Sequence, residues 1–254
     1  MTVTERIIAH LPLSLSLLFA VEVLDTTQWG LNYEAPVGMD FGKISPAFEL
    51  TVLFYMAGNN NTKVTLPGGS SRVLQQGESG LVRVNQADKL VSDKPIQVVL
   101  AAGDVNSTYE VRWYSMRPIE NYARSYVTPV GDSYGKTKVV IYNPGPAVLT
   151  FTLQYLLNGV RTQYSQSVNA KQAAFTIVIP TGSGALIDGT SNFVALSLTD
   201  TESKDSSGQT TNGQAYDWGF PLVPRNELTS QVLIGLGYAC TNNNCQGKAW
   251  QLPQ

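Results

Sequence analysis

The chain holds few residues that could perform acid–base or nucleophilic chemistry. Its 254 residues include one histidine, His10, so a Ser-His-Asp or Cys-His site would have to use it. A zinc site of nitrogen and sulfur ligands would need nearly every such side chain present. His10 lies in an apolar stretch, which favours a histidine packed in a strand. We therefore expect neither a catalytic triad nor a zinc centre.

Pairs of carboxylates could hydrolyse glycosides if they faced each other across a cleft. The candidates are Glu110 with Asp104, and Asp217 beside Trp218. A chain of this size that is divided into repeats has little room for a deep cleft, so a small β-scaffold glycoside hydrolase is a remote alternative. The sequence has neither a Gly-x-Ser-x-Gly nucleophile elbow nor a Walker phosphate loop. We predict a protein that is not an enzyme and that needs no cofactor.

Two loops could bind calcium through oxygen side chains. Asp104 and Asp200 each begin a polar loop, and Ca²⁺ requires about six to eight oxygen ligands. The EF-hand pattern is absent, and Asp, Asn and Ser also stabilise turns by bonding to their own backbone. We expect turns without metal and keep Asp104 and Asp200 as the calcium candidates.

Composition excludes two further classes. Charged residues make up 14% of the chain and the net charge is −2, so a basic face for nucleic acid is not expected. The apolar run at residues 11–20 is too short to span a bilayer. It is either the core of a signal peptide or a pair of buried strands.

Alternation of apolar and polar residues predicts strands along most of the chain. In one candidate strand the apolar residues on one face are Phe48, Leu50, Val52, Phe54 and Met56. Turn signals, such as the Asn158-Gly159 pair, separate the strands. No segment sustains a helical period. Many short strands about ten residues apart are typical of β-sandwiches and barrels.

Internal similarity divides the chain into repeats. Trp29, Trp113 and Trp218 each follow an apolar strand and a polar loop and precede a proline. Pro36-Val37-Gly38 recurs as Pro129-Val130-Gly131. We predict an all-β fold of two consecutive β-sandwich-like modules with Trp/Pro connectors, flanked by partial modules. The predicted boundaries are 1–45 (final strands of a partial module plus a connector), 46–135 (first module with its connector), 136–217 (second module) and 218–254 (C-terminal connector). The chain could be a slice of a longer one.

Aromatic residues gather at the predicted connectors. The three tryptophans could plug module boundaries or stack on sugars, and their equivalent positions favour plugs. Tyrosine supplies rigid amphipathic contact area, so the connector tyrosines are our candidate interaction surface. Ordinary strand tyrosines are the alternative. The tyrosines concerned are Tyr109, Tyr114, Tyr122, Tyr126 and Tyr134.

The two cysteines, Cys240 and Cys245, flank four polar residues. This spacing suits a small loop closed by a disulfide, which would indicate an oxidising compartment. A reduced pair in a surface turn is the alternative.

The sequence resembles the N-terminal domain family of IgGFc-binding proteins, and more closely its bacterial and archaeal relatives in large cell-surface proteins. The residues that carry the resemblance lie at 25–38, 103–114, 125–131, 140–144 and 216–229. The resemblance covers most of residues 21–254 and implies repeated β-sandwich-like modules in secreted surface proteins, without catalytic residues. Antibody binding by vertebrate members is not transferred, because a shared scaffold does not fix function.

We therefore expect a non-catalytic, extracellular structural or adhesive segment of a prokaryotic cell-surface protein. Its partners would be other surface proteins or copies of itself, with exposed strands pairing into a filament. A carbohydrate-binding module for polysaccharides is the alternative, and it requires an exposed tryptophan or a coplanar tyrosine pair.

Overall fold

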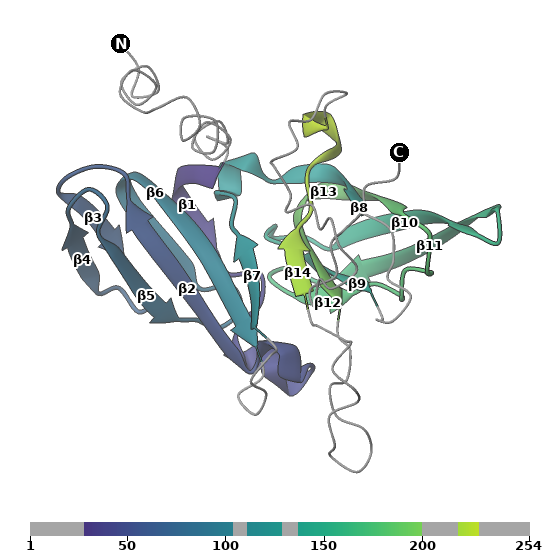
Figure 1. Cartoon of the computed structure of the whole chain (residues 1–254), viewed down its shortest axis with the longest axis horizontal. Helices are drawn as coiled ribbons and strands as arrows, with labels where there is room; N and C mark the ends of the chain where they lie inside the picture. The colour runs from purple at the N-terminus through teal and green to yellow at the C-terminus, as the bar shows by residue number, and fades with distance from the viewer. Residues whose placement is uncertain (1–27, 104–110, 129–136, 200–217, 229–254) are drawn as a thin grey trace, which may run out of the picture. The chain divides into compact units, whose positions relative to one another are not determined.

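The computed structural model describes residues 28–103, 111–128, 137–199 and 218–228. These residues form two curled antiparallel sheets of seven strands each, joined by turns and short 3-10 helices (Figure 1). The described residues contain no α-helix. The predicted all-β class is confirmed at this level.

Each sheet is built from consecutive strands. The first contains β1 (Trp29–Glu34), β2 (Leu50–Ala57), β3 (Thr62–Thr65), β4 (Ser71–Leu74), β5 (Ser79–Arg83), β6 (Lys89–Gly103) and β7 (Val111–Ser115). The second contains β8 (Ala123–Thr128), β9 (Lys138–Tyr142), β10 (Leu149–Leu157), β11 (Val160–Val168), β12 (Ala173–Phe175), β13 (Ala185–Thr199) and β14 (Trp218–Pro221). The short helices are η2 (Met39–Lys43), η3 (Pro46–Phe48), η4 (Ile119–Asn121) and η5 (Arg225–Glu227).

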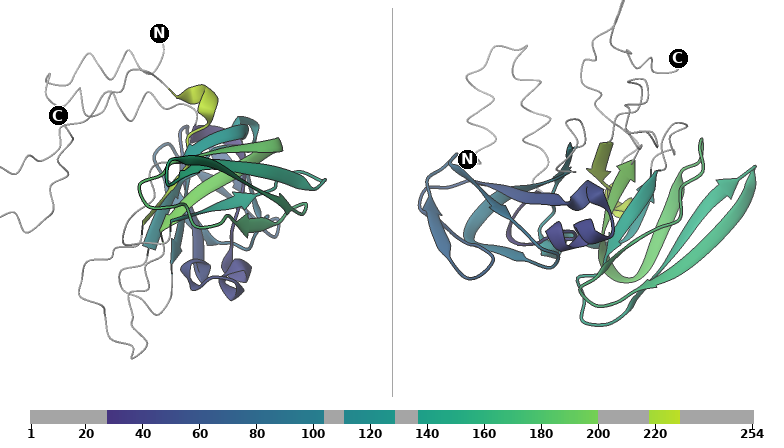
Figure 2. Two further views of the ribbon diagram at one scale, coloured as in Figure 1. Left: turned by 90° about the vertical axis from the view of Figure 1, so that its right-hand side faces the viewer. Right: turned by 90° about the horizontal axis from the view of Figure 1, so that it is seen from below.

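The two sheets share one pattern of strand pairing. In the first, β6 pairs with β1, β2, β3 and β7, while β2 also pairs with β5 and β3 with β4. In the second, β13 pairs with β8, β9, β10 and β14, while β9 also pairs with β12 and β10 with β11. Each strand of the first sheet therefore has an equivalent in the second sheet, seven strands later in chain order. We call β1–β7 the first module and β8–β14 the second; Figure 2 shows both sheets curling.

Equivalent tyrosines confirm this alignment at the level of single residues. The Tyr33 hydroxyl donates to the Ile96 carbonyl at 2.7 Å, beside a bulge between β1 and β6. The Tyr126 hydroxyl donates to the Phe193 carbonyl at 2.7 Å, beside the same irregularity between β8 and β13. In the sequence, a Pro-Val-Gly triplet begins three residues after each tyrosine.

Strand pairing draws the module boundaries differently from the sequence analysis. β1 lies within 1–45, which we assigned to a preceding partial module, but it pairs with β6. β8 lies within 46–135 but pairs with β13, and β14 lies within 218–254 but also pairs with β13. Each module thus takes in the strand that precedes its Pro-Val-Gly segment. Most of residues 1–45, and the expected disulfide loop, lie outside the described residues.

Burial follows strand alternation in the first module. In β2, Leu53 and Tyr55 are buried, whereas Phe54 and Met56 are only half-buried on the opposite face. The apolar residues predicted to share a face of this strand do so from Leu50 to Met56, but on the face turned away from the buried core. This leaves an apolar sheet face that the core of the module does not use.

Candidate functional site: the junction between the two modules

The core of the first module extends onto the sheet of the second. Its cluster of buried apolar side chains includes residues of β9 and β13, and a separate cluster fills the interior of the second module. Because successive side chains of a strand point to opposite faces, β9 contributes to both clusters. Val139 and Ile141 lie in the interior of the second module, while Val140 and Tyr142 pack with the first.

Three phenylalanine rings pack across the junction. Phe41 of η2 and Phe48 of η3 are almost fully buried, and their ring centroids are 5.5 Å apart. Phe175 of β12 lies 5.5 Å from Phe41 and 6.4 Å from Phe48. Such aromatic pairs contribute beyond their area of burial. The segment between β1 and β2 is therefore held against the second sheet.

A buried carboxylate adds a polar link. Glu34, the last residue of β1, is 1% exposed. It accepts a hydrogen bond from the hydroxyl of Tyr142, and Lys171 Nζ donates to its two oxygens at 2.8 and 3.1 Å. Lys89 Nζ lies 3.9 Å from one of these oxygens. Two of these three partners belong to the second module, so the charge of Glu34 is satisfied across the junction.

Lys171 occupies a backbone conformation that favours glycine. Its φ is 58°, and the equivalent residue of the first module is Gly77, with a φ of 82°. Both backbone N–H groups donate at 2.9 Å to equivalent carbonyls, that of Gly77 to Ala57 at the end of β2 and that of Lys171 to Asn143, the residue after β9. A side chain in this region costs about 1 kcal/mol or more. The contact with Glu34 offsets that cost in the second module.

The end strands of the two modules also meet. Arg112 of β7 is buried, and its guanidinium donates to the carbonyl of Thr199 at 3.4 Å. The hydroxyl of Tyr114 lies against Gly219 of β14, where a Cβ atom would come within 2.2 Å of it. Position 219 therefore needs glycine to let the Tyr114 ring approach β14.

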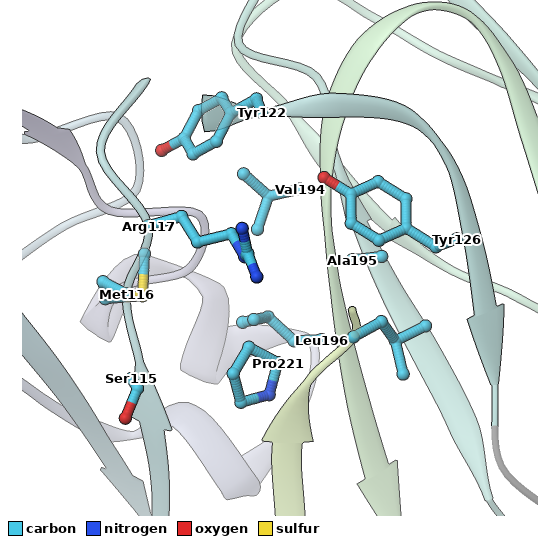
Figure 3. Close-up of a pocket in the computed structure, with 10 residues that line it drawn as sticks. Ser115, Met116, Arg117, Tyr122, Tyr126, Val194, Ala195, Leu196 and Pro221 are labelled. Atoms are coloured by element: carbon cyan, nitrogen blue, oxygen red, sulfur yellow. The ribbon is translucent and has the colours of Figure 1, made fainter. Parts of the chain in front are cut away.

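A small cavity lies where the connector between β7 and β8, residues 116–122, meets the second sheet (Figure 3). Arg117, Tyr122 and Tyr126 line it together with side chains of β13. The guanidinium of Arg117 binds both carboxylate oxygens of Glu227, at 2.8 and 2.7 Å. The cavity volume is about 10 Å³. That is space for about one water and too little for a sugar or a peptide side chain.

Burial keeps the junction tyrosines neutral. It raises the pKa of Tyr122 and Tyr142 far above the usual value, and the nearby Glu34 carboxylate raises the pKa of both further. Burial likewise raises the pKa of Tyr33, and it raises the pKa of Tyr126 to about 12. These phenols therefore act as hydrogen-bond donors and apolar rings across the physiological range.

The predicted tyrosine surface is wrong where the structure describes it. Tyr114, Tyr122 and Tyr126 are 0%, 5% and 2% exposed, so they cannot form an exposed surface. Tyr114 of β7 and Tyr122 are buried in the core of the first module, and Tyr126 of β8 is buried in the interior of the second. Tyr109 and Tyr134 lie outside the described residues.

The three tryptophans are not equivalent. Trp29 begins the first strand of its module, whereas Trp113 and Trp218 lie in the last strands, one register position apart. Trp113 is 55% exposed and its ring lies 5.4 Å from that of Phe54, so it does not plug the junction. Trp29 is half-buried against Gly58.

The remaining residues that the sequence analysis considered for chemistry lie outside the described residues. They are His10, Asp104, Glu110, Asp200, Asp217, Cys240 and Cys245. Within the described ranges, no three His, Cys, Asp or Glu side chains gather as metal ligands. In the same ranges, no helix is long and apolar enough to cross a membrane.

Sequence reasoning missed the residues that form the polar link. Glu34, Tyr142 and Lys171 come from three distant segments, and no local motif joins them. The repeated Pro-Val-Gly triplet indicates two copies of the module, but its spacing of 93 residues aligns Gly77 with Ala170 and does not identify Lys171.

Comparison with known proteins gives one finding on the family. The family model described as IgGFc binding protein matches residues 20–207. The match covers all of the first module and the second through β13. No curated protein matches the chain.

The polar link predicts coupling between its two charges. We expect Lys171→Met to lower the free energy of unfolding by about 2 kcal/mol, because it leaves a buried carboxylate with fewer donors. Glu34→Gln combined with Lys171→Met should cost less than the sum of the two single changes. Urea unfolding measures all three, with Lys63→Met as the exposed control. Strict additivity would contradict the link.

The buried tyrosines predict a loss of stability in alkali. A tyrosine of the unfolded chain ionises near pH 10, whereas these phenols stay protonated in the fold, so the folded state binds more protons above about pH 10. The free energy of unfolding should be unaffected by them below about pH 10 and fall as the pH rises further. Thermal unfolding against pH, with tyrosinate absorbance, measures this. Ionisation of all tyrosines while the sheet signal stays intact would contradict it.

Proposed function

The chain belongs to the IgGFc binding protein family, and from that membership we propose that it is a non-catalytic structural or adhesive segment of an extracellular prokaryotic cell-surface protein. The observation that carries the proposal is the duplicated module with a buried junction. A chain that repeats one module and buries the contact between the copies resists bending, as a spacer must. Fc binding is not carried over to this chain, because one scaffold hosts many functions.

The proposed structural role includes a proposal on the architecture of the two sheets. Each curled sheet acts as a sandwich-like module, and the first completes its core with the sheet of the second. Support comes from the connectors, since Pro118 and Pro224 each precede a 3-10 helix after the last strand of a module. A connector that recurs in this way suits a tandem array.

Two features favour a structural role over a catalytic one. The buried carboxylate that the structure describes, Glu34, is engaged by Tyr142 and Lys171 rather than turned toward a substrate. The cavity beside the junction has a volume of about 10 Å³, which admits no substrate larger than water. A glycoside hydrolase on this scaffold therefore stays a remote alternative.

Adhesion and self-assembly would use the sheet edges. In the described residues, β4 and β5 end the first sheet, and β11 and β12 end the second. Val73 of β4 is 60% exposed and Val160 of β11 is 66% exposed. Open edges with apolar side chains pair readily with strands of other chains, so other surface proteins and copies of this chain are the proposed partners.

The location can be tested on intact cells of the source organism. We expect an antibody raised against the purified chain to label cells that have not been permeabilised, and external protease to remove the label. A cytoplasmic protein detected in the same cells serves as the control. Labelling that requires permeabilised cells would refute the extracellular role.

A carbohydrate-binding module is the second candidate, and the exposure of Trp113 favours it. A half-exposed indole on a sheet face, backed by Phe54, offers a flat surface for the apolar face of a sugar ring. On this reading polysaccharides shift or quench tryptophan emission, and Trp113→Ala abolishes binding, whereas Trp29→Phe leaves it unchanged. Equal binding by Trp113→Ala and the wild type would exclude this site.

A further inference from the structure

The first module carries an exposed apolar face on the side of its sheet away from its core. Phe54 of β2 pairs with Leu81 of β5 on one side and with Val99 of β6 on the other. The next row on this face joins Val52, Ala101 and Trp113. Leu81 is 58% and Trp113 55% exposed, and Phe54, Val52 and Val99 are half-buried. We call these six side chains the outer face.

The equivalent face of the second module is covered by the first module. The register places Val140 at the position of Phe54, with Phe175 at the position of Leu81 and Leu196 at that of Val99. Val140 and Leu196 are at most 1% exposed and belong to the core cluster of the first module. Phe175 packs on Phe41 and Phe48. Where this surface has a neighbouring module, that module buries it.

We propose that the outer face of the first module binds the end of the second module that contains η5, in another copy of this chain, so that copies stack head to tail. The inference rests on the proposed structural role and names its contact surface. The contact joins two different surfaces of the chain. A stack of copies therefore has an unoccupied outer face at one end and an unoccupied second-module surface at the other. A contact of this kind extends into a filament unless its rotation closes a ring.

The η5 end of the second module carries an exposed apolar residue where the junction has a buried one. Tyr122 follows η4 and lines the junction cavity with Val194 and Leu196. The residue that follows η5 in the same way is Leu228, which is 53% exposed. At the residue after its last 3-10 helix, the second module thus repeats an apolar side chain that the first module uses to cover its neighbour.

The contact between copies differs from the junction in two ways. At the positions of Glu34 and Lys171 it has Val127 and Gly77, so it lacks the polar link. At the position of Gly219 it has Trp113, which adds apolar area. The association should therefore depend on apolar burial and persist at high salt, since screening weakens only charged contacts.

Sedimentation velocity of the full chain over a range of concentrations tests the proposal. We expect the wild type to form a ladder of oligomers in low and high salt. Leu81→Asp places a charge in the outer face of the first module, and Leu228→Asp places a charge at the η5 end of the second. Each variant has lost one of the two contact surfaces, so each variant alone should be monomeric. An equimolar mixture of the two should form dimers and nothing larger, because it offers a single working contact. Val148→Asp, at an exposed site in the loop before β10, should assemble like the wild type.

Two outcomes would overturn the inference. A wild type that stays monomeric at every concentration would mean that no second copy binds the face. Assembly of Leu81→Asp to the same extent as the wild type would place the contact elsewhere, for example at the strand edges. Unchanged circular dichroism of the variants excludes misfolding as the cause. Neither outcome contradicts the proposed location at the cell surface, which antibody labelling of intact cells tests separately.

Discussion

Two strands, β9 and β13, bury both of their faces over most of their shared length, and the arrangement of the described chain depends on this. One face closes the interior of the second module, and the other completes the core of the first. A strand in this position needs apolar residues without alternation, as the run Val139-Val140-Ile141-Tyr142 has. The equivalent strand β2 alternates between buried and half-buried residues because the structure places no module on its outer face.

The polar link at Glu34 restricts how this shared sheet is used. Apolar packing is tolerant of small shifts, whereas a buried carboxylate must meet its donors or pay the cost of desolvation. With Tyr142 and Lys171 on the opposite module, the link is satisfied in one alignment of the two sheets. The first module has an uncharged glycine where Lys171 stands, so the link distinguishes the internal junction from other faces of the same shape.

The sequence was sufficient for the properties that depend on local pattern. Alternation and turn residues predicted an all-β chain. The order of the short motifs along the chain predicted the family, which the match to the family model establishes. The strand pairing divides the described residues differently from the predicted module boundaries, because it depends on which distant strand each segment pairs with. The first strand of each module lies next in sequence to the preceding connector, yet it pairs with a strand more than fifty residues later.

The candidate site was less predictable for the same physical reason. Tyr122 stands in a polar connector sequence that suggests exposure, but it and Tyr114 of β7 pack in the cluster that includes side chains of β9 and β13. Glu34 and Lys171 lie 137 residues apart, and neither stands in a motif that indicates a partner. A glycine-type backbone at Lys171 becomes informative only when it is compared with Gly77 in the aligned turn.

The shared sheet also sets an order for folding during synthesis. The ribosome releases the first module before β9 and β13, whose side chains complete its core. Until those strands emerge and pair, Phe41 and Phe48 have no Phe175 to pack against, and Glu34 has neither Tyr142 nor Lys171. Domains generally fold as units as the chain emerges. Here the earlier-made module must wait for the later one, so the pair matures together as a single folding unit.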